Sequence, residues 1–347
     1  MELGLNMGYW GSGNDAENLE LAKEADRLGY AVAWVAEAYG SDAPTVLAWV
    51  AAQTERIDVG SAIFQIPGRT PANCAMTAAT LDTLSGGRFR LGLGVSGPQV
   101  SEGWHGVRFD KPLARTREYL EIVEMALSRQ KVRYDGQHWT LPLPDGPGKA
   151  LQLTVHPVRE HIPTYLAAVG PKNLELAGEK FDGWLAIFYS PDYAKESLAS
   201  IEAGRAKVGK ALEGFDVVPT VPIVVGDDPE AAARSIAWYS ALYVGGMGSR
   251  EKNFYNQLAV RMGFDEAAKQ VQDLYLERKY DEAAAAVPFD FIDGTSLLGP
   301  KERIAEKMQA MAASGVTTLT LSPMSGTLEE RKAALRTAVE AAEQAGV

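Results

Sequence analysis

Short apolar runs alternate with amphipathic segments along the first 130 residues. Apolar runs predict strands at residues 3–7, 31–36, 57–65 and 88–95, and the run at 31–36 is apolar on both faces. Such a strand is typical of a parallel sheet that is covered on both sides. Between the runs, the spacing of apolar positions predicts helices at residues 15–28, 43–53, 71–84 and 113–127.

The same alternation returns after residue 161. Strands are predicted at residues 164–169, 183–188, 217–225 and 316–321, and helices from Pro171 and at 191–208, 229–243, 300–314 and 328–345. Two segments interrupt the pattern. Residues 131–161 are rich in Gly and Pro and predict an insertion with a hairpin near 134–140, and residues 245–290 predict a second, mostly helical insertion.

Strand–helix units in strict alternation predict a closed α/β fold, the (β/α)8 TIM barrel, with insertions after the fourth and seventh units. A doubly wound open sheet is the alternative architecture. Because no Gly/Ser-rich linker separates two cores, we expect residues 1–347 to form a single domain.

Composition narrows the range of partners. The chain has 34 Lys and Arg against 45 Asp and Glu, a formal net charge of −11, which disfavours nucleic acid and anionic membranes. The apolar runs are too short to cross a bilayer, and the N-terminus does not resemble a signal peptide. Cys74 is the one cysteine, which excludes an intrachain disulfide and a multi-cysteine zinc site. We expect a soluble, cytoplasmic protein with no membrane or nucleic-acid partner.

A barrel of this kind builds its active site from the loops that follow its strands. These loops contain aromatic residues and glycines, among them Tyr9, Trp10 and Tyr39, and one clear carboxylate, Glu37. Glycines admit a flat ring close to the backbone and aromatic side chains stack on it, so the loops favour a flat aromatic ligand. The alternative for each residue taken singly is a turn or a core position.

Acid–base candidates are few. Glu37 ends a buried strand, and His105 lies just beyond the fourth strand, so both are predicted catalytic residues. None of the four histidines is four residues from another, and no metal site is predicted. The glycines of residues 92–97 fit a dinucleotide-binding motif superficially, but the acidic residue that this motif needs is missing.

The segment at 81–94, Leu-Asp-Thr-Leu-Ser-Gly-Gly-Arg-Phe-Arg-Leu-Gly-Leu-Gly, resembles the signature of the luciferase-like flavin/deazaflavin oxidoreductase family. Residues 34–37, 60–63, 69–71, 165–172 and 182–184 agree with it in the same order along the chain. The subgroup that the sequence resembles most is that of the coenzyme F420-dependent oxidoreductases.

This resemblance implies a deazaflavin ring at the carboxyl ends of the strands, beside a non-prolyl cis peptide at Ala62–Ile63. It implies cofactor contacts from Glu37 and from two loops, comprising Gly94, Val95, Ser96, Gly97, Ala168, Val169 and Gly170. Relatives that act on sugar phosphates have a His after the acid and a Glu in the fourth-strand loop. Here Ala38 and the segment Gly97-Pro98-Gln99 replace them, which puts that substrate in doubt.

The function implied is hydride transfer between coenzyme F420 and a small to medium, rather apolar organic substrate. An FMN-dependent monooxygenase that uses reduced flavin and oxygen is the alternative, and a barrel that binds its ligand without turnover is a third. Arg250 and Lys252 are candidates to hold the cofactor phosphate. A homodimer is expected, with the helices at 43–53 and 71–84 as candidate interface.

Overall fold

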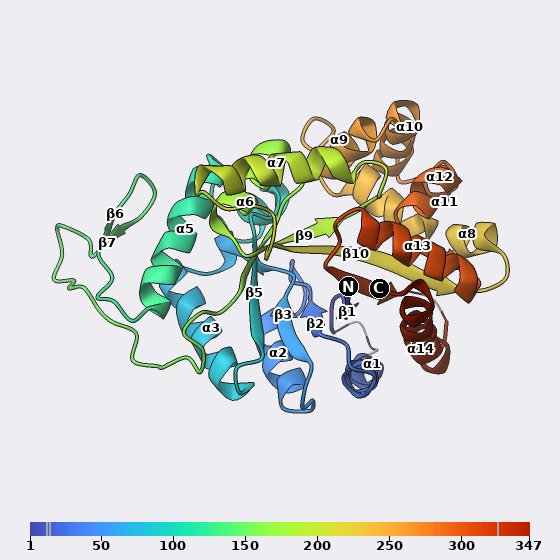
Figure 1. Ribbon diagram of the computed structural model, residues 1–347. Coiled ribbons are helices and arrows are strands. Elements are labelled where there is room, and N and C mark those ends of the chain that lie inside the picture. Colours follow the sequence, from blue (N-terminus) through green and yellow to red (C-terminus); the bar gives the residue numbers. More distant parts are fainter. Residues whose placement is uncertain (12, 14, 325) are drawn as a thin grey trace.

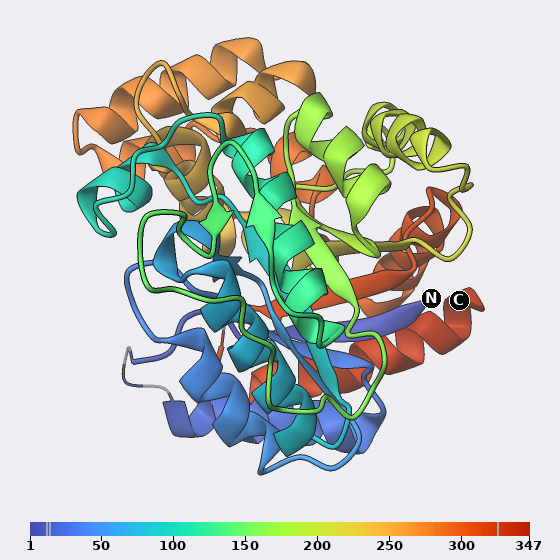
Figure 2. The same ribbon diagram turned by 90° about the vertical axis from the view of Figure 1, so that its left-hand side faces the viewer.

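The computed structural model describes residues 1–11, 13, 15–324 and 326–347. Eight parallel strands close into a barrel, in the spatial order β12-β1-β2-β3-β5-β8-β9-β10, with β10 pairing back onto β12 (Figures 1 and 2). The predicted TIM barrel is therefore confirmed. The eight strands are β1 (Glu2–Asn6), β2 (Val32–Val35), β3 (Asp58–Ser61), β5 (Phe89–Gly94), β8 (Thr164–Ala167), β9 (Gly183–Ile187), β10 (Asp216–Val225) and β12 (Thr318–Pro323).

Helices surround the barrel and follow the predicted segments closely. Side chains of Asp42, Thr70 and Asp228 accept hydrogen bonds from backbone N–H groups in the first turns of α2, α3 and α8, which fixes where these helices begin. The surrounding helices are α1 (Asp15–Leu28), α2 (Ala43–Ala51), α3 (Pro71–Leu84), α5 (Pro112–Leu127), α6 (Pro171–Lys180), α7 (Ala194–Lys207), α8 (Pro229–Ala241), α13 (Lys301–Ala313) and α14 (Leu328–Ala345).

The strand predicted at 57–65 is not continuous, and this part of the prediction was wrong. It divides into β3 and a short β4 (Phe64–Gln65), which pairs with β5. The peptide between them, Ala62–Ile63, is cis, as the family resemblance implied. Three further elements were not predicted: the short 3-10 helix η1 (Ile66–Gly68), helix α4 (Pro98–Gly103), and strand β11 (Leu297–Gly299), which pairs with the end of β10.

The first insertion carries the predicted hairpin, formed by β6 (Tyr134–Asp135) and β7 (Thr140–Leu141). The buried Asp82 of α3 anchors its far end. Its carboxylate accepts hydrogen bonds from the Arg159 side chain, at 2.6 and 2.8 Å, and from the backbone N–H of Val158 and Arg159. A charge without solvent needs such partners, so this ion pair ties the insertion to the barrel.

The second insertion is helical, as predicted, and appears in orange in Figure 1. It contains a π-helical turn, η2 (Leu242–Gly246), and four helices: α9 (Phe254–Arg261), α10 (Asp265–Leu276), α11 (Tyr280–Ala285) and α12 (Phe289–Gly294). An apolar cluster joins these helices to Ile187, Val224 and Met324, at or just beyond the carboxyl ends of β9, β10 and β12. The insertion therefore packs on the end of the barrel where an active site is expected.

The barrel interior is tightly packed between β3 and β5. The Ser61 hydroxyl donates to the Gly92 carbonyl and accepts from the Gly92 N–H, both at 2.9 Å. A Cβ on Gly92 would lie 1.9 Å from the Ser61 carbonyl oxygen, so this position admits only glycine. Within the described residues, no helix is long and apolar enough to cross a membrane.

Candidate functional site

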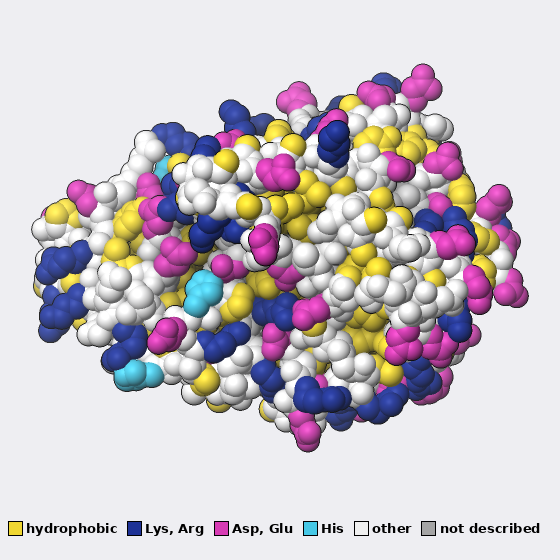
Figure 3. Space-filling view, viewed as in Figure 1, with side chains coloured by type: hydrophobic (Ala, Val, Ile, Leu, Met, Phe, Trp, Pro, Cys, Tyr) yellow, Lys and Arg dark blue, Asp and Glu magenta, His cyan; other side chains and the backbone are white. Residues whose placement is uncertain are grey.

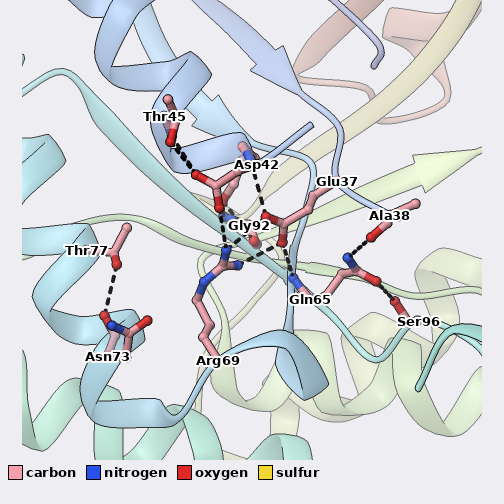
Figure 4. Close-up of polar contacts among 12 residues, drawn as sticks. Glu37, Ala38, Asp42, Thr45, Gln65, Arg69, Asn73, Thr77, Gly92 and Ser96 are labelled. Atoms are coloured by element: carbon pink, nitrogen blue, oxygen red, sulfur yellow. Dashed lines mark hydrogen bonds and ion pairs between the residues drawn. The ribbon is translucent and has the colours of Figure 1, made fainter. Parts of the chain in front are cut away.

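Glu37 follows β2 and lies at the centre of a buried polar network (Figure 4). The Arg69 guanidinium donates two hydrogen bonds of 2.8 Å to the Glu37 carboxylate. Both side chains are largely buried, with exposed fractions of 10% for Arg69 and 8% for Glu37. The backbone N–H groups of Gln65 and Ala43 also donate to Glu37, at 3.1 and 3.3 Å. Both carboxylate oxygens are thus engaged, which suits a group that fixes the loops after β2 and β4.

Gln65 extends this network toward β5. Its side-chain amide donates to the Ala38 carbonyl, and its amide oxygen accepts from the Ser96 hydroxyl at 2.6 Å (Figure 4). The Arg69 guanidinium lies 4.6 Å from the centre of the Phe64 ring, a distance that allows a cation–π contact. Residues from three strand ends, Glu37, Gln65 and Ser96, are therefore held together as one unit.

The stretch Gly94–Gly97 lies against the Ala62–Ile63 segment. A Cβ on Gly94 would lie 2.2 Å from Cδ1 of Ile63, so any side chain here would force the Ile63 side chain to move. Ser96 adopts a left-handed backbone conformation with φ of 58°, and Gly97 is the N-cap of α4. The structure thus brings the predicted residues of β3, β5 and Glu37 together at one side of the barrel mouth.

The third predicted stretch, Ala168–Gly170, follows the next strand, β8. The Trp184 indole donates to the Ala168 carbonyl at 2.8 Å, and Arg261 donates to the Val169 carbonyl at 3.0 Å. Gly170 is the N-cap of α6, and open space surrounds the place where its Cβ would be. In the first turn of α6, Oδ1 of Asn173 is buried and has no hydrogen-bond partner among the described residues.

Two cavities border these stretches. One of about 280 Å³ lies between the turn after β4 and the loop after β5, and Arg69, Val95 and Trp139 are among its lining residues. Another of about 30 Å³ lies beside Ala168 and Val169. The larger one has room for part of an organic ligand.

His105 packs behind the turn after β4. Its Cε1 would lie 3.3 Å from a Cβ on Gly68, and within the described part of the chain its buried Nε2 has no hydrogen-bond partner. The catalytic roles of His105 and Glu37 stay predictions. Arg250 is paired with Asp273, an ion pair that competes with the predicted phosphate contact.

Sequence analysis did not single out a cluster of tyrosines that joins α8 to the second insertion. Tyr243 lies with its ring centre 4.9 Å from those of Tyr239 and Tyr255, and 5.7 Å from that of Phe188. Tyr9, which follows β1 and is 44% exposed, lies close to Tyr243. Burial raises the pKa of all four tyrosines above the usual value, so they stay protonated at neutral pH.

Comparison with known proteins identifies a family and several relatives. The sequence profile of the luciferase-like monooxygenases matches residues 7–318. A protein of Mycobacterium tuberculosis described as a candidate coenzyme F420-dependent oxidoreductase is 44% identical over 329 residues, which cover 93% of this chain and 95% of that protein. The 5,10-methylenetetrahydromethanopterin reductase of Archaeoglobus fulgidus is 28% identical, with 85% of this chain and 86% of the reductase covered.

Solved structures share the fold. The coenzyme F420-dependent tetrahydromethanopterin reductase of Methanopyrus kandleri superposes with a TM-score of 0.82 at 24% identity, covering 97% of each chain. An F420-dependent secondary alcohol dehydrogenase in complex with an F420–acetone adduct superposes with a TM-score of 0.79 at 17% identity, covering 98% of each chain.

Proposed function

Because the chain belongs to the luciferase-like monooxygenase family, we propose that it is an oxidoreductase that transfers a hydride between coenzyme F420 and a small to medium organic substrate. The observation that carries the proposal is the 44% identity to a candidate F420-dependent oxidoreductase over almost the whole of both chains. The arrangement of the barrel mouth supports it.

The predicted residues fit a deazaflavin. Ala62–Ile63 and Gly94–Gly97 would hold one part of the ring system, and Ala168–Gly170 the part next to it. The open space at Gly170 leaves room for a phosphate at the N-terminus of α6, where the helix dipole favours an anion. Oδ1 of Asn173, which has no partner in the described ranges of the chain, would accept a hydrogen bond from a hydroxyl of the cofactor's sugar-alcohol chain.

When bound, such a cofactor supplies a hydride at its central ring carbon, and the protein's part is to orient and enclose the reactants. Glu37 would act by holding Arg69 and the backbone of Gln65 in place, which fixes the loop against which the ring would lie. Glu37 and His105 are also the proposed proton-transfer groups, and Glu37→Gln and His105→Asn test this role.

A monooxygenase that uses reduced FMN and oxygen is the second candidate, and the description of the matched family favours it. The same loops serve either ring, because flavin and deazaflavin share their shape. The two candidates differ in which cofactor binds tightly.

Fluorescence titration separates the candidates. We expect F420 to bind with saturation and FMN to bind weakly, since the proposal assigns the pocket to the deazaflavin. As a matched pair, Gly170→Val places a branched side chain in the proposed phosphate space, whereas Gly146→Val makes the same change at an exposed glycine in the first insertion that also has open space around it. Gly170→Val should weaken F420 binding by at least tenfold. Tight FMN binding without F420 binding would replace the proposed cofactor.

We also propose a homodimer through α2 and α3. These helices leave Trp49, Met76 and Leu84 exposed by 44%, 54% and 65%, and apolar surface of this kind on neighbouring helices suits an interface. Light scattering should give the mass of a dimer for the wild type, and Met76→Lys should shift it toward the monomer. A wild-type monomer would contradict the assignment.

A further inference from the structure

The topology of the barrel places its two mouth walls opposite each other. Counting round the barrel, β3 and β10 are separated by four strand steps in either direction. The segment after β3 bears the proposed ring-contacting residues Ala62 and Ile63, and the insertion after β10 bears Tyr243. If the cofactor lies as proposed above, on which this inference rests, its free face and the substrate lie toward the β10 side.

The turn that carries Tyr243 has a specialised backbone. The π-helical turn η2 leaves carbonyl groups of Tyr243 and Val244 that the Asn253 side chain satisfies, at 2.9 and 3.0 Å, and Asn253 is itself 2% exposed. Asn256 donates to the Val244 carbonyl as well, at 3.1 Å. π-Helical turns often occur at functional sites, and these amides hold this one in a defined position.

Glycines let α10 close on the same turn. A Cβ on Gly245 would lie 2.5 Å from Cβ of Tyr275, and one on Gly246 would lie 2.3 Å from the Tyr275 ring. The Tyr275 side chain therefore fills the space between η2 and α10. The Tyr243 ring contacts that of Phe188, just beyond the end of β9.

The polar groups of Glu37 and Ser96, on the β3 and β5 side of the mouth, already have partners. Both oxygens of Glu37 accept from Arg69, and the Ser96 hydroxyl donates to Gln65. Tyr243 lies on the opposite wall, in an apolar cluster that includes Phe188 and Tyr255, and Tyr9 lies close to it. This wall combines a proton donor with an apolar surface.

We propose that Tyr243, assisted by Tyr9, binds the oxygen of a carbonyl group in an apolar substrate and gives it a proton. In the reductive direction, the hydride from the reduced deazaflavin forms a C–H bond at the carbonyl carbon, and the C=O π bond breaks. Its electron pair takes the proton of the Tyr243 hydroxyl, which yields an alcohol and the oxidised cofactor. Tyr9, which is 44% exposed, returns a proton from solvent to Tyr243.

Tyr243→Phe tests this role, because it removes the hydroxyl and keeps the ring. Tyr134→Phe is the matched control: its hydroxyl donates to Glu121 at 2.7 Å in the hairpin insertion, away from the mouth. The first measurement is F420 affinity, which should change less than twofold in either variant. If the wild type does not bind F420, the proposed function is wrong. The role of Tyr243 is then decided by the second measurement alone.

The second measurement is the infrared C=O stretch of carbonyl-labelled cyclohex-2-enone added to the protein, with and without oxidised F420. A hydrogen bond from Tyr243 lowers this frequency in the wild type and in Tyr134→Phe, and the frequency should rise in Tyr243→Phe. Reduction of the same ketone by reduced F420 should fall by about a hundredfold in kcat, the range for loss of a general acid. An equal C=O frequency in wild type and Tyr243→Phe, or no binding of the ketone, would overturn the inference.

Discussion

Replacing Arg69 by Met should destabilise the protein by leaving the Glu37 carboxylate buried without its cation. Removing one partner of a buried ion pair typically costs about 3–5 kcal/mol. Here Glu37 keeps the N–H groups of Gln65 and Ala43, at 3.1 and 3.3 Å, so the low end, about 3 kcal/mol, applies. Met retains most of the aliphatic volume that packs on Phe64.

Thermal unfolding measures this cost. With an unfolding entropy of about 2.1 cal/mol/K per residue, a chain of 347 residues should lose about 4 °C in Tm for a loss of about 3 kcal/mol. Glu37→Gln should lose less, because Arg69 retains Asp42 at 3.6 Å. The double variant should melt well above the temperature expected from adding the two single losses, since it removes both charges. An Arg69→Met protein that melts within about 1 °C of the wild type, or strictly additive losses, would show that the Glu37–Arg69 pair does not stabilise the fold in this way.

Three further predictions concern other parts of the fold. Gly92→Ala should fail to give soluble, folded protein by circular dichroism, because its Cβ would overlap the Ser61 carbonyl; a folded variant with wild-type Tm would contradict the packing. Hydrogen bonds from Arg27, and then from Arg336, lower the pKa of Glu24 from its usual 4.5 to about 2. The ionised Glu24 therefore stabilises the fold above about pH 4.5, and this stabilisation is lost as the pH falls toward 2. Glu24→Gln should therefore melt below the wild type at pH 7, with a gap that closes in acid; a gap independent of pH would disprove this. Burial raises the pKa of Cys74 to about 11, so a thiol reagent at pH 8 should label it only after denaturation, and rapid labelling of the native protein would show that the site opens.

Hydrophobic periodicity was sufficient for the barrel because its signal is repeated in every strand–helix unit. The run at 31–36 is apolar on both faces, and β2 within it is fully buried. Periodicity failed where the backbone departs from regular geometry without a change in polarity. Ala62 and Ile63 look like strand residues, yet they separate β3 from β4. In the same way, the helix predicted to continue to Tyr243 ends at Ala241 and passes into a π-helical turn.

The sequence placed Glu37 and Gly94–Gly97 at one end of the barrel because carboxyl ends of parallel strands meet there. It did not predict the ion pair between Arg69 and Glu37. These residues are 32 positions apart in the sequence, and their pairing depends on how the turn after β4 folds. Tyr243 was missed for a similar reason. It lies at the start of an insertion, and nothing in its local pattern shows that the insertion packs onto the barrel mouth.

A crystal structure with coenzyme F420 would show where the cofactor binds. We expect one deazaflavin ring in contact with Ala62–Ile63, Gly94–Gly97 and Ala168–Gly170, its phosphate at the start of α6 and its free face toward Tyr243. A cofactor bound elsewhere, or touching only one of these three stretches, would contradict this prediction.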